Sequence, residues 1–370
     1  MLAGCGSDAA PERTALAPST TTVPTEAVTS TRPPSRQAQQ VSVRTVAPAC
    51  QAGTTASRGT ALAGDIYVAA CRDTVVGYDL VRQSVAWTRP LGAPVLTLAA
   101  NDAVAVAYVD RSVPASGLAA ARRSIVAVGL NVQGGEQVWD REVSVSSTLE
   151  PYPLTHAQAK VVVLPVAGDQ FAVVDNGGAE KWRTPPLAID VVIADNGKLI
   201  LATPTYVHPS SGNKVPEDLT NVYDAESGRL VGRVPDVDTQ PWSAYGLHSP
   251  SLGVDWLDLR TGKVLRQLRS KTGYLLRNTL LEDDSSSGPS ANLAAITETG
   301  ATRWTLPETV VADFAVIGGR LFVTNRSGQV IEVSEETGTE ERQWERRPAV
   351  VGTHWAILAT GAAVSVRPLD

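Results

Sequence analysis

The chain has 370 residues, of which 43% are hydrophobic, so it is long enough to bury a large core. Its net charge is −6 at pH 7 without a long run of one sign, which argues against a nucleic-acid-binding protein and against a polybasic membrane-surface patch. No stretch of 18 apolar residues occurs, so no transmembrane helix is predicted.

The first residues have the form of a bacterial lipobox. Leu2-Ala3-Gly4 places one aliphatic and two small residues before Cys5, as a lipoprotein signal peptidase requires. We predict that residues 1–5 are a signal remnant and that Cys5 is lipidated, which would anchor the protein to the outer face of the bacterial cytoplasmic membrane. The alternative is a chance cysteine. Only four residues precede Cys5, so we expect an upstream start codon or a trimmed sequence.

A segment rich in Pro, Thr and Ser follows over residues 6–40 and contains no aromatic residue. Such a composition buries too little apolar surface to offset its chain entropy, so we predict a disordered tether. The two remaining cysteines, Cys50 and Cys71, form an even pair in an exported chain, and we predict a disulfide between them. The alternative is two small buried hydrophobic side chains.

From Val41 onward, short β-branched runs alternate with Gly, Asn and Asp turns, which predicts an all-β repeat fold. In the first unit, strands at 66–70, 74–79 and 85–88 follow one another, with a fourth strand leading in. We expect a four-stranded antiparallel meander. Equivalent units cover residues 95–142, 154–184, 188–235, 245–269, 275–306 and 314–344.

Five units repeat a phrase in which a strand ends near an Asp, a turn follows, and a tryptophan comes next. The five are Trp87, Trp139, Trp182, Trp304 and Trp344. Because each would lie near the start of the outermost strand, we interpret them as structural residues that pack between adjacent sheets, each worth about 2–3 kcal/mol, rather than as ligand-stacking residues. Two further copies, around Val231 and Leu265, keep the turn and lack the tryptophan.

A repeat period near forty residues indicates a β-propeller. After Trp344 only two or three strands remain, over residues 350–360 and 362–367, while the alternating strand Val41–Val46 has no unit of its own. We predict that this N-terminal strand pairs with the last sheet and closes the ring. The propeller would then span residues 41–370 with eight blades, and seven blades is the alternative.

Two units carry a recognisable motif. Residues 64–68 with Tyr78-Asp79 and Trp87, and residues 319–323 with Thr337-Gly338 and Trp344, resemble the PQQ-like β-propeller repeats of quinoprotein dehydrogenases and of the Gram-negative outer-membrane assembly lipoprotein. The enzyme branch of that family carries adjacent cysteines, a calcium ion and a catalytic Asp. This chain has no adjacent cysteines and is shorter, so we place it in the non-enzymatic branch and expect no cofactor.

Other candidates for chemistry are weak. The four histidines, which we expect at surface or turn positions, are scattered without metal-binding spacing: His156, His208, His248 and His354. The acidic run Glu282-Asp283-Asp284 lacks the spacing of a calcium loop and is expected in a solvated turn. No nucleophile elbow, P-loop or dinucleotide fingerprint is found, so we expect no catalytic residue and no metal.

Two functions remain. The first is a monomeric, non-catalytic scaffold that binds a protein or another envelope component, with no nucleic-acid partner, through insertions at 111–123, 208–218 and 283–290 or through the units without tryptophan. The second is a lyase or hydrolase that acts on envelope polysaccharide, with several acids and a base converging in the central funnel. We favour the scaffold because the sequence shows no such convergence.

Overall fold

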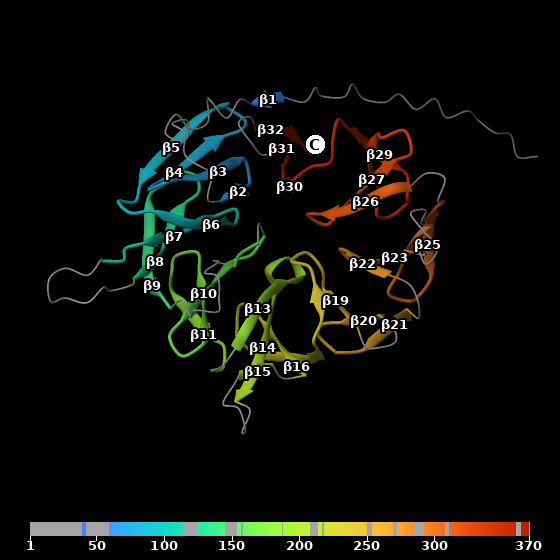
Figure 1. Ribbon diagram of the computed structural model, residues 1–370, viewed down its shortest axis with the longest axis horizontal. Helices are drawn as coiled ribbons and strands as arrows, with labels where there is room; N and C mark the ends of the chain where they lie inside the picture. The colour runs from blue at the N-terminus through green and yellow to red at the C-terminus, as the bar shows by residue number, and fades with distance from the viewer. Residues whose placement is uncertain are drawn as a thin grey trace, which may run out of the picture. The chain divides into compact units, whose positions relative to one another are not determined.

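The described strands form eight antiparallel sheets arranged as the blades of a ring (Figure 1). The computed structural model describes residues 39–41, 59–113, 124–144, 154–156, 158–186, 188–207, 214–216, 218–249, 254–268, 272–283, 292–307, 311–359 and 364–369. All of these lie in the unit Ala38–Asp370. The chain is therefore an eight-bladed β-propeller, and the prediction of eight blades rather than seven is confirmed.

Each blade is a meander whose first strand lies nearest the ring axis and whose last strand lies outermost (Figure 1). Blades one to four contain β2 (Thr60–Ala63), β3 (Ile66–Cys71), β4 (Thr74–Asp79), β5 (Ser84–Pro90); β6 (Val95–Ala100), β7 (Val104–Asp110), β8 (Ile125–Asn131), β9 (Gln137–Val143); β10 (Val161–Val166), β11 (Gln170–Asp175), β12 (Glu180–Arg183); β13 (Ala188–Ala194), β14 (Leu199–Val207), β15 (Lys214–Pro216), β16 (Leu219–Asp224), β17 (Leu230–Pro235).

Blades five to eight complete the ring. They contain β18 (Asp238–Thr239), β19 (Tyr245–His248), β20 (Val254–Asp258), β21 (Val264–Leu268); β22 (Thr272–Leu276), β23 (Thr279–Asp283), β24 (Leu293–Ile296), β25 (Thr302–Leu306); β26 (Val311–Ile317), β27 (Arg320–Asn325), β28 (Val330–Val333), β29 (Glu340–Trp344); β30 (Val350–Val351), β31 (Trp355–Ala359), β32 (Val364–Pro368), β1 (Gln39–Val41). A single bridge between Leu154 and Val163 takes the inner position of blade three, and β15 is a short addition to β14.

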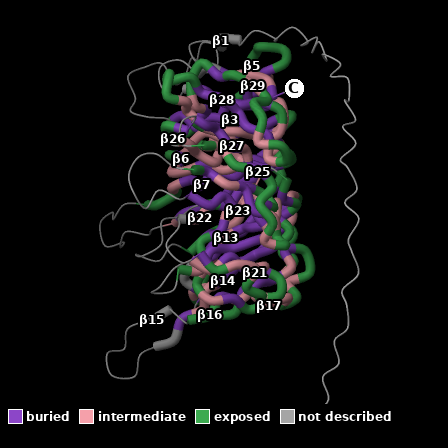
Figure 2. The backbone as a smooth tube through the Cα atoms, turned by 90° about the vertical axis from the view of Figure 1, so that its right-hand side faces the viewer, coloured by how far each residue is buried: buried purple, intermediate pink, exposed green. Residues whose placement is uncertain are grey.

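The pattern of burial follows the position of a strand in its blade. Every residue of β3 is buried, because a middle strand is covered by a neighbouring blade on each side, and its sequence is a continuous apolar run. In β5, an outermost strand, only Trp87 is buried. Viewed edge-on, the buried strands lie between exposed turns at the two faces (Figure 2). Among the described residues, no helix is long and apolar enough to cross a membrane.

The ring is closed by the N-terminal strand, as predicted. In β1, Gln39 pairs with Val366 and Val41 with Val364 in antiparallel register, so β1 is the outermost strand of blade eight. It begins two residues before the predicted start at Val41, and the rest of the predicted strand lies outside the described residues. Strands from opposite ends of the chain therefore share one sheet, which leaves no gap in the ring.

The core is divided among the interfaces between blades. One cluster joins blades one and two through Val68, Val95 and Val128, and another joins blades eight and one through Tyr78, Trp355 and Val366. Each of the other interfaces has a cluster of its own. Because every blade buries both faces against its neighbours, stability is a sum of interface terms around the ring.

The connections alternate between the two faces because every sheet is an antiparallel meander. Turns between first and second strands, and between third and fourth strands, lie on one face; the second-to-third connections lie on the other. The three predicted insertions at 111–123, 208–218 and 283–290 are all second-to-third connections, in blades two, four and six. Most of their residues lie outside the described part of the chain.

Candidate functional site

Four of the five tryptophans pack across a blade interface onto the turn glycine of the next blade. A Cβ on the turn glycine of the next blade would lie 2.5 Å from Trp87 at Gly135, and 2.4 Å from Trp139 at Gly178. The indole N–H groups of these residues donate to the Val132 carbonyl at 2.7 Å and to the Asn176 carbonyl at 3.0 Å. Trp182 and Trp304 bond in the same way to the carbonyls of Ala225 and Glu335, each at 2.9 Å. The four are held by the neighbouring blade and are structural.

A fixed spacing underlies this packing. The interface residue comes four positions after a turn residue with positive φ, which is Gln83 at 55° before Trp87 and a glycine in the later blades. Strand register agrees, because Trp87, Trp139, Trp182 and Trp304 each pair just before the bulge in their sheets. The same count and register identify the interface residues of blades four, five and seven as Gly232, Arg266 and Arg342.

Trp344 packs between blades seven and eight, as predicted, but it does not lie at the repeat position of the other four tryptophans. It is buried two residues further along β29, and its N–H donates to the Glu332 carboxylate at 3.1 Å within its own blade. The guanidinium of Arg367 lies 4.8 Å from its ring. Arg342 donates to the Pro368 carbonyl at 2.9 Å instead. Blade eight takes its outer strand from the N-terminus, so it offers no hairpin turn to receive an indole.

The interface between blades five and six adds polar contacts to its apolar cluster. Arg266 donates to the Gly300 carbonyl at 3.2 Å and forms an ion pair with the buried Glu282 of blade six. Tyr245 donates to the Glu298 carboxylate at 2.9 Å, and burial, then this hydrogen bond, raises the pKa of Tyr245 to about 12. Trp256 pairs with Arg266 in the sheet, so blade five carries its tryptophan on the third strand, β20, and not on the outer strand, β21.

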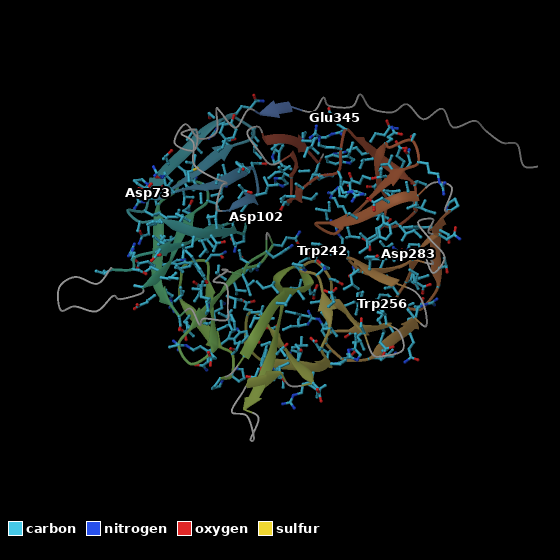
Figure 3. The ribbon with its side chains drawn as sticks, in the orientation of Figure 1. Asp73, Asp102, Trp242, Trp256, Asp283 and Glu345 are labelled. Atoms are coloured by element: carbon cyan, nitrogen blue, oxygen red, sulfur yellow. The ribbon has the colours of Figure 1, made fainter. Side chains whose placement is uncertain are left out.

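Glu282 and Asp283 are buried in β23 and do not lie in a solvated turn as the sequence predicted. Arg266 lies at the tryptophan position of blade five and pairs with Glu282. This ion pair offsets the desolvation cost of burying the Glu282 carboxylate. Figure 3 shows Trp256 and Asp283 within their blades, away from the axis. No signal in the acidic run itself would have revealed this, because the partner lies in another unit.

At the position of the interface residue, blade four has neither a tryptophan nor an arginine but Gly232. A Cβ on Gly232 would lie 2.5 Å from the Arg260 carbonyl oxygen, and a Cβ on Gly262 would lie 2.9 Å from the Arg233 carbonyl oxygen. The outer strand of blade four therefore lies backbone against backbone on the turn of blade five. The cluster beneath is aliphatic throughout, with Val222, Val234 and Leu259 among its members.

Next to this contact the outer surface has an unusual composition. After the turn glycine, blades four and five both present a cation and two aliphatic residues, Arg229-Leu230-Val231 and Lys263-Val264-Leu265. Leu230 is 43% exposed and Val264 is 41% exposed. The equivalent cation position in the other turned blades holds Ser84, Glu136, Ala179, Ala301 and Thr339. We call Arg229, Leu230, Arg233, Lys263 and Val264 the basic–aliphatic rim.

The cations of the basic–aliphatic rim have no ion-pair partner in the described part of the chain. The side chains of Arg229, Arg233 and Lys263 are exposed, and no carboxylate among those residues lies within ion-pair distance of them. Two neighbouring acids accept hydrogen bonds within their turns, Asp224 from Ser227 and Asp258 from Thr261. The Ser227 hydrogen bonds, and to a smaller extent the charge of Arg229, lower the pKa of Asp224.

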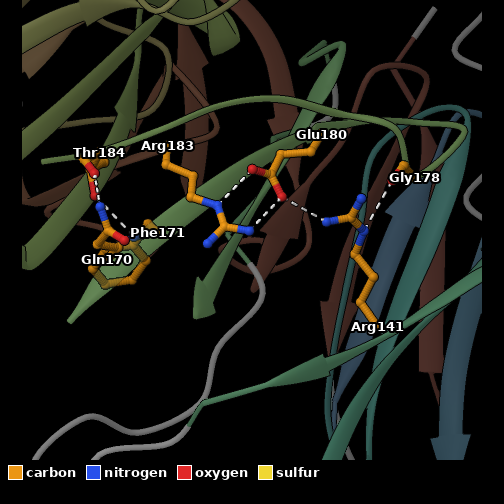
Figure 4. A network of polar contacts seen from close by, with 7 residues as sticks. All are labelled: Arg141, Gln170, Phe171, Gly178, Glu180, Arg183 and Thr184. Atoms are coloured by element: carbon orange, nitrogen blue, oxygen red, sulfur yellow. Dashed lines mark hydrogen bonds and ion pairs between the residues drawn. The ribbon is translucent and has the colours of Figure 1, made fainter. Parts of the chain in front are cut away.

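At the rim between blades two and three, two arginines share one carboxylate (Figure 4). Glu180 accepts from Arg141 at 3.0 Å and from Arg183 at 2.6 and 3.0 Å, so one carboxylate joins two blades. The Arg183 hydrogen bond, ahead of the opposing effect of burial, lowers the pKa of Glu180. Behind it, Gln170 donates to the Thr184 carbonyl at 2.9 Å.

Carboxylates at the inner turns serve as links between blades. Asp102 accepts from the Gly64 N–H of blade one at 2.8 Å and from the Thr353 hydroxyl of blade eight at 3.3 Å, and Figure 3 shows it near the axis. Asp65 lies 3.0 Å from the Trp355 N–H and 3.1 Å from His354 Nδ1. These contacts assign the two carboxylates to ring packing.

The predicted histidines do not converge. His156 is in blade three, where burial lowers its pKa, and His248 lies 2.8 Å from the Asp236 carbonyl in blade five. His208 lies outside the described residues. Over the ranges that the structure covers, no group of three or more His, Cys, Asp or Glu could hold a metal ion.

Cys71 ends β3, where it is buried and disulfide-bonded. Its partner is not among the described residues, so pairing with Cys50 stays a prediction, as does lipidation of Cys5. No feature of the sequence marked the basic–aliphatic rim directly, although the loss of tryptophan near Val231 and Leu265 had singled out the two blades that carry it.

No family model matches the chain, and no curated protein matches it. Its fold is similar to the crystal structure of the computationally designed Ika8 protein, at 11% identity and a TM-score of 0.52 over 90% of this chain and all of that one. Two further similar structures are BamB from Moraxella catarrhalis, at 17% identity, a TM-score of 0.47 and coverage of 84% and 96%, and the dihydro-heme d1 dehydrogenase NirN in complex with DHE, at 14%, 0.46, 77% and 65%. At such identities the likeness concerns the fold alone.

Proposed function

We propose that this protein is a non-catalytic scaffold of the PQQ-like propeller type, anchored in the bacterial cell envelope through Cys5, that holds a protein partner on its rim. The observation that carries the proposal is the basic–aliphatic rim. There Leu230 and Val264 are 43% and 41% exposed, beside cations that form no ion pair within the described residues. Exposed aliphatic groups that lie together on a rigid support are a feature of interaction surfaces.

The tether supports the same proposal. A lipobox before Cys5 and a Pro/Thr/Ser-rich segment over residues 6–40 fit a propeller held at a distance from the outer face of the cytoplasmic membrane. Inner-turn carboxylates such as Asp65 and Asp102 are engaged in contacts between blades, which favours the scaffold over a hydrolase or lyase with its acids in the funnel.

Two measurements test this function. Intact mass of the full chain extracted from membranes is expected to show a diacylglyceryl group, which a Cys5→Ser variant loses together with membrane association. In vivo cross-linking of the tethered protein is expected to give one discrete protein adduct. An unmodified chain in the soluble fraction would remove the anchor, and the absence of any adduct at any site of the ring would remove the scaffold.

A further inference from the structure

The basic–aliphatic rim repeats one arrangement in two adjacent blades. In each, a turn glycine is followed by a cation and then by an exposed aliphatic side chain: Arg229 and Leu230 in blade four, Lys263 and Val264 in blade five. The backbone contact between Arg233 and Gly262 brings the two copies next to each other. Leu230 and Val264 therefore lie on the outer strands of adjacent blades, each next to a cation.

The cations of this surface form no ion pair within the described residues. Asp224 and Asp258 accept hydrogen bonds within their own turns, and the nearby Glu226 forms an ion pair with Lys181 at 3.6 Å. Arg260 is likewise taken by Asp195 at 2.8 Å. Three cations, on Arg229, Arg233 and Lys263, remain for an external group. Complementary charge across an interface steers encounter and selects the partner.

The outermost strands also make an accessible border. Strands β17 and β21 end their sheets, so each presents an edge that no other described strand covers. Val231 and Leu265, next to the exposed aliphatic residues, pack onto the interface clusters below. The surface is thus anchored in the core of the ring, as a rigid binding surface requires.

We propose that the basic–aliphatic rim binds an extended, acidic segment of a partner protein whose aliphatic side chains contact Leu230 and Val264 while its carboxylates pair with Arg229, Arg233 and Lys263. This inference rests on the proposed scaffold function and specifies the partner class. An anionic membrane surface would satisfy the cations, but the neighbouring acids at Glu226 and Asp236 and the position on the side of the ring favour a narrow segment over a broad charged plane.

Binding is tested with a fluorescein-labelled peptide of alternating Glu and Val, with a Gln–Val peptide as the neutral probe. Fluorescence anisotropy with the full chain is expected to show saturable binding of the Glu–Val peptide that weakens as salt is added, and at least tenfold weaker binding of the Gln–Val peptide. The Arg229→Ser/Lys263→Ser variant should lose about tenfold in affinity, and Leu230→Ser/Val264→Ser a similar factor. Arg89→Ser, which removes an exposed cation from the outer strand of blade one, should change nothing.

The inference is overturned if the Glu–Val peptide shows no saturable binding, or if Arg89→Ser lowers its affinity as much as the rim variants do. It is also overturned if the peptide does not bind but phosphatidylglycerol vesicles bind in a way that depends on Arg229 and Lys263. Concentration-dependent self-association that those variants abolish would assign the rim to a second copy of the chain instead. Circular dichroism of each variant confirms that the ring is folded.

A final arm separates this inference from the scaffold function. A photo-crosslinking residue is placed at Leu230 or Val264 and, on the outer strands of other blades, at Val85 or Val138, which are 39% and 48% exposed. Val85 is the matched position, two residues after its turn residue, and Val138 lies three residues after Gly135. Adducts at the first pair alone support the inference. Adducts only at the second pair overturn it and leave the scaffold standing, whereas adducts at neither pair, nor on the insertion face, count against both.

Discussion

The interfaces between blades two and three and between blades four and five solve the same packing problem in different ways. In the first, Trp139 fills the space over Gly178, and the Glu180 carboxylate pairs with both Arg141 and Arg183. In the second, Gly232 brings the strand itself onto the Arg260 carbonyl, and the arginines and lysine outside stay unpaired. The comparison teaches that the ring tolerates loss of the large side chain when the blades approach more closely.

Close approach does not replace the apolar area of an indole. A tryptophan side chain buries about 150–250 Å², which corresponds to roughly 4–6 kcal/mol of transfer free energy as an upper limit. The buried cluster of the 4–5 interface is aliphatic, around Val222, Val234 and Leu259. We therefore expect this interface to open locally at lower free energy than the 2–3 interface, because local stability follows buried apolar contact.

The largest effect is expected from Trp139→Ala. Truncation removes the packing over Gly178 and leaves a cavity across the 2–3 interface, so the free energy of unfolding should fall by about 3–5 kcal/mol. Chemical denaturation followed by circular dichroism measures it. Trp344→Ala is the informative comparison: it also removes a buried ring, but adds loss of a hydrogen bond to Glu332 rather than loss of a turn contact. A loss below about 1 kcal/mol for Trp139→Ala would show that the indole is dispensable.

The sequence was sufficient for the architecture because its signals are local. Turn residues, alternating strands and the surplus strand before the first unit predicted eight blades and their closure, and β1 pairs with β32 as expected. Register was the weaker part. Trp344 matched the repeat by eye, yet the spacing of four residues from Gly338 assigns Arg342 to the interface.

Burial of Glu282 and the chemistry of the rim could not be predicted from the sequence, since both depend on neighbours one blade away. Arg266 and Glu282 belong to different units, and only the ring brings them together. The loss of tryptophan in blades four and five was visible in the sequence. The sequence did not show whether the blades move apart or come closer where the tryptophan is missing. The role of Gly232 becomes clear only from its short distance to the Arg260 carbonyl oxygen.

An intermediate effect is expected at the 5–6 interface from Arg266→Ala, which leaves Glu282 buried without this arginine. Removing one member of a fully buried ion pair costs about 3–5 kcal/mol. The Arg266 side chain is 34% exposed, so solvent screening lowers the expectation to about 2–3 kcal/mol. Thermal and denaturant unfolding check it. If the Arg266→Ala/Glu282→Leu double variant regains stability, the cost came from burying the Glu282 carboxylate without Arg266. If it does not, the cost came from lost packing.

A smaller effect is expected from Gly232→Ala, which tests the backbone contact of the 4–5 interface directly. The new methyl group would lie 2.5 Å from the Arg260 carbonyl oxygen, so the blades must separate slightly. Overpacking costs about 1–3 kcal/mol, and the low end applies because Arg260 is in a turn that can shift. Ser84→Ala, an exposed site on the outer strand of blade one, is the control. Equal stability of the two variants would mean that the interface is looser than the structure indicates.

The smallest effect concerns pH and the network that only the 2–3 interface has. The Arg183 hydrogen bond holds the pKa of Glu180 below its usual value of 4.5, so this carboxylate contributes stability above about pH 4.5 that is lost as the pH falls through its lower folded pKa. In Arg183→Gln the pKa of Glu180 should rise toward the usual value, as carboxyl carbon NMR titration would measure. Asp224, whose pKa is lowered by Ser227 in blade four, should titrate unchanged. If the pKa values of both carboxyls shift together, the change reflects the net charge of the whole ring. The hydrogen bond from Arg183 in Figure 4 would then have no specific effect on Glu180.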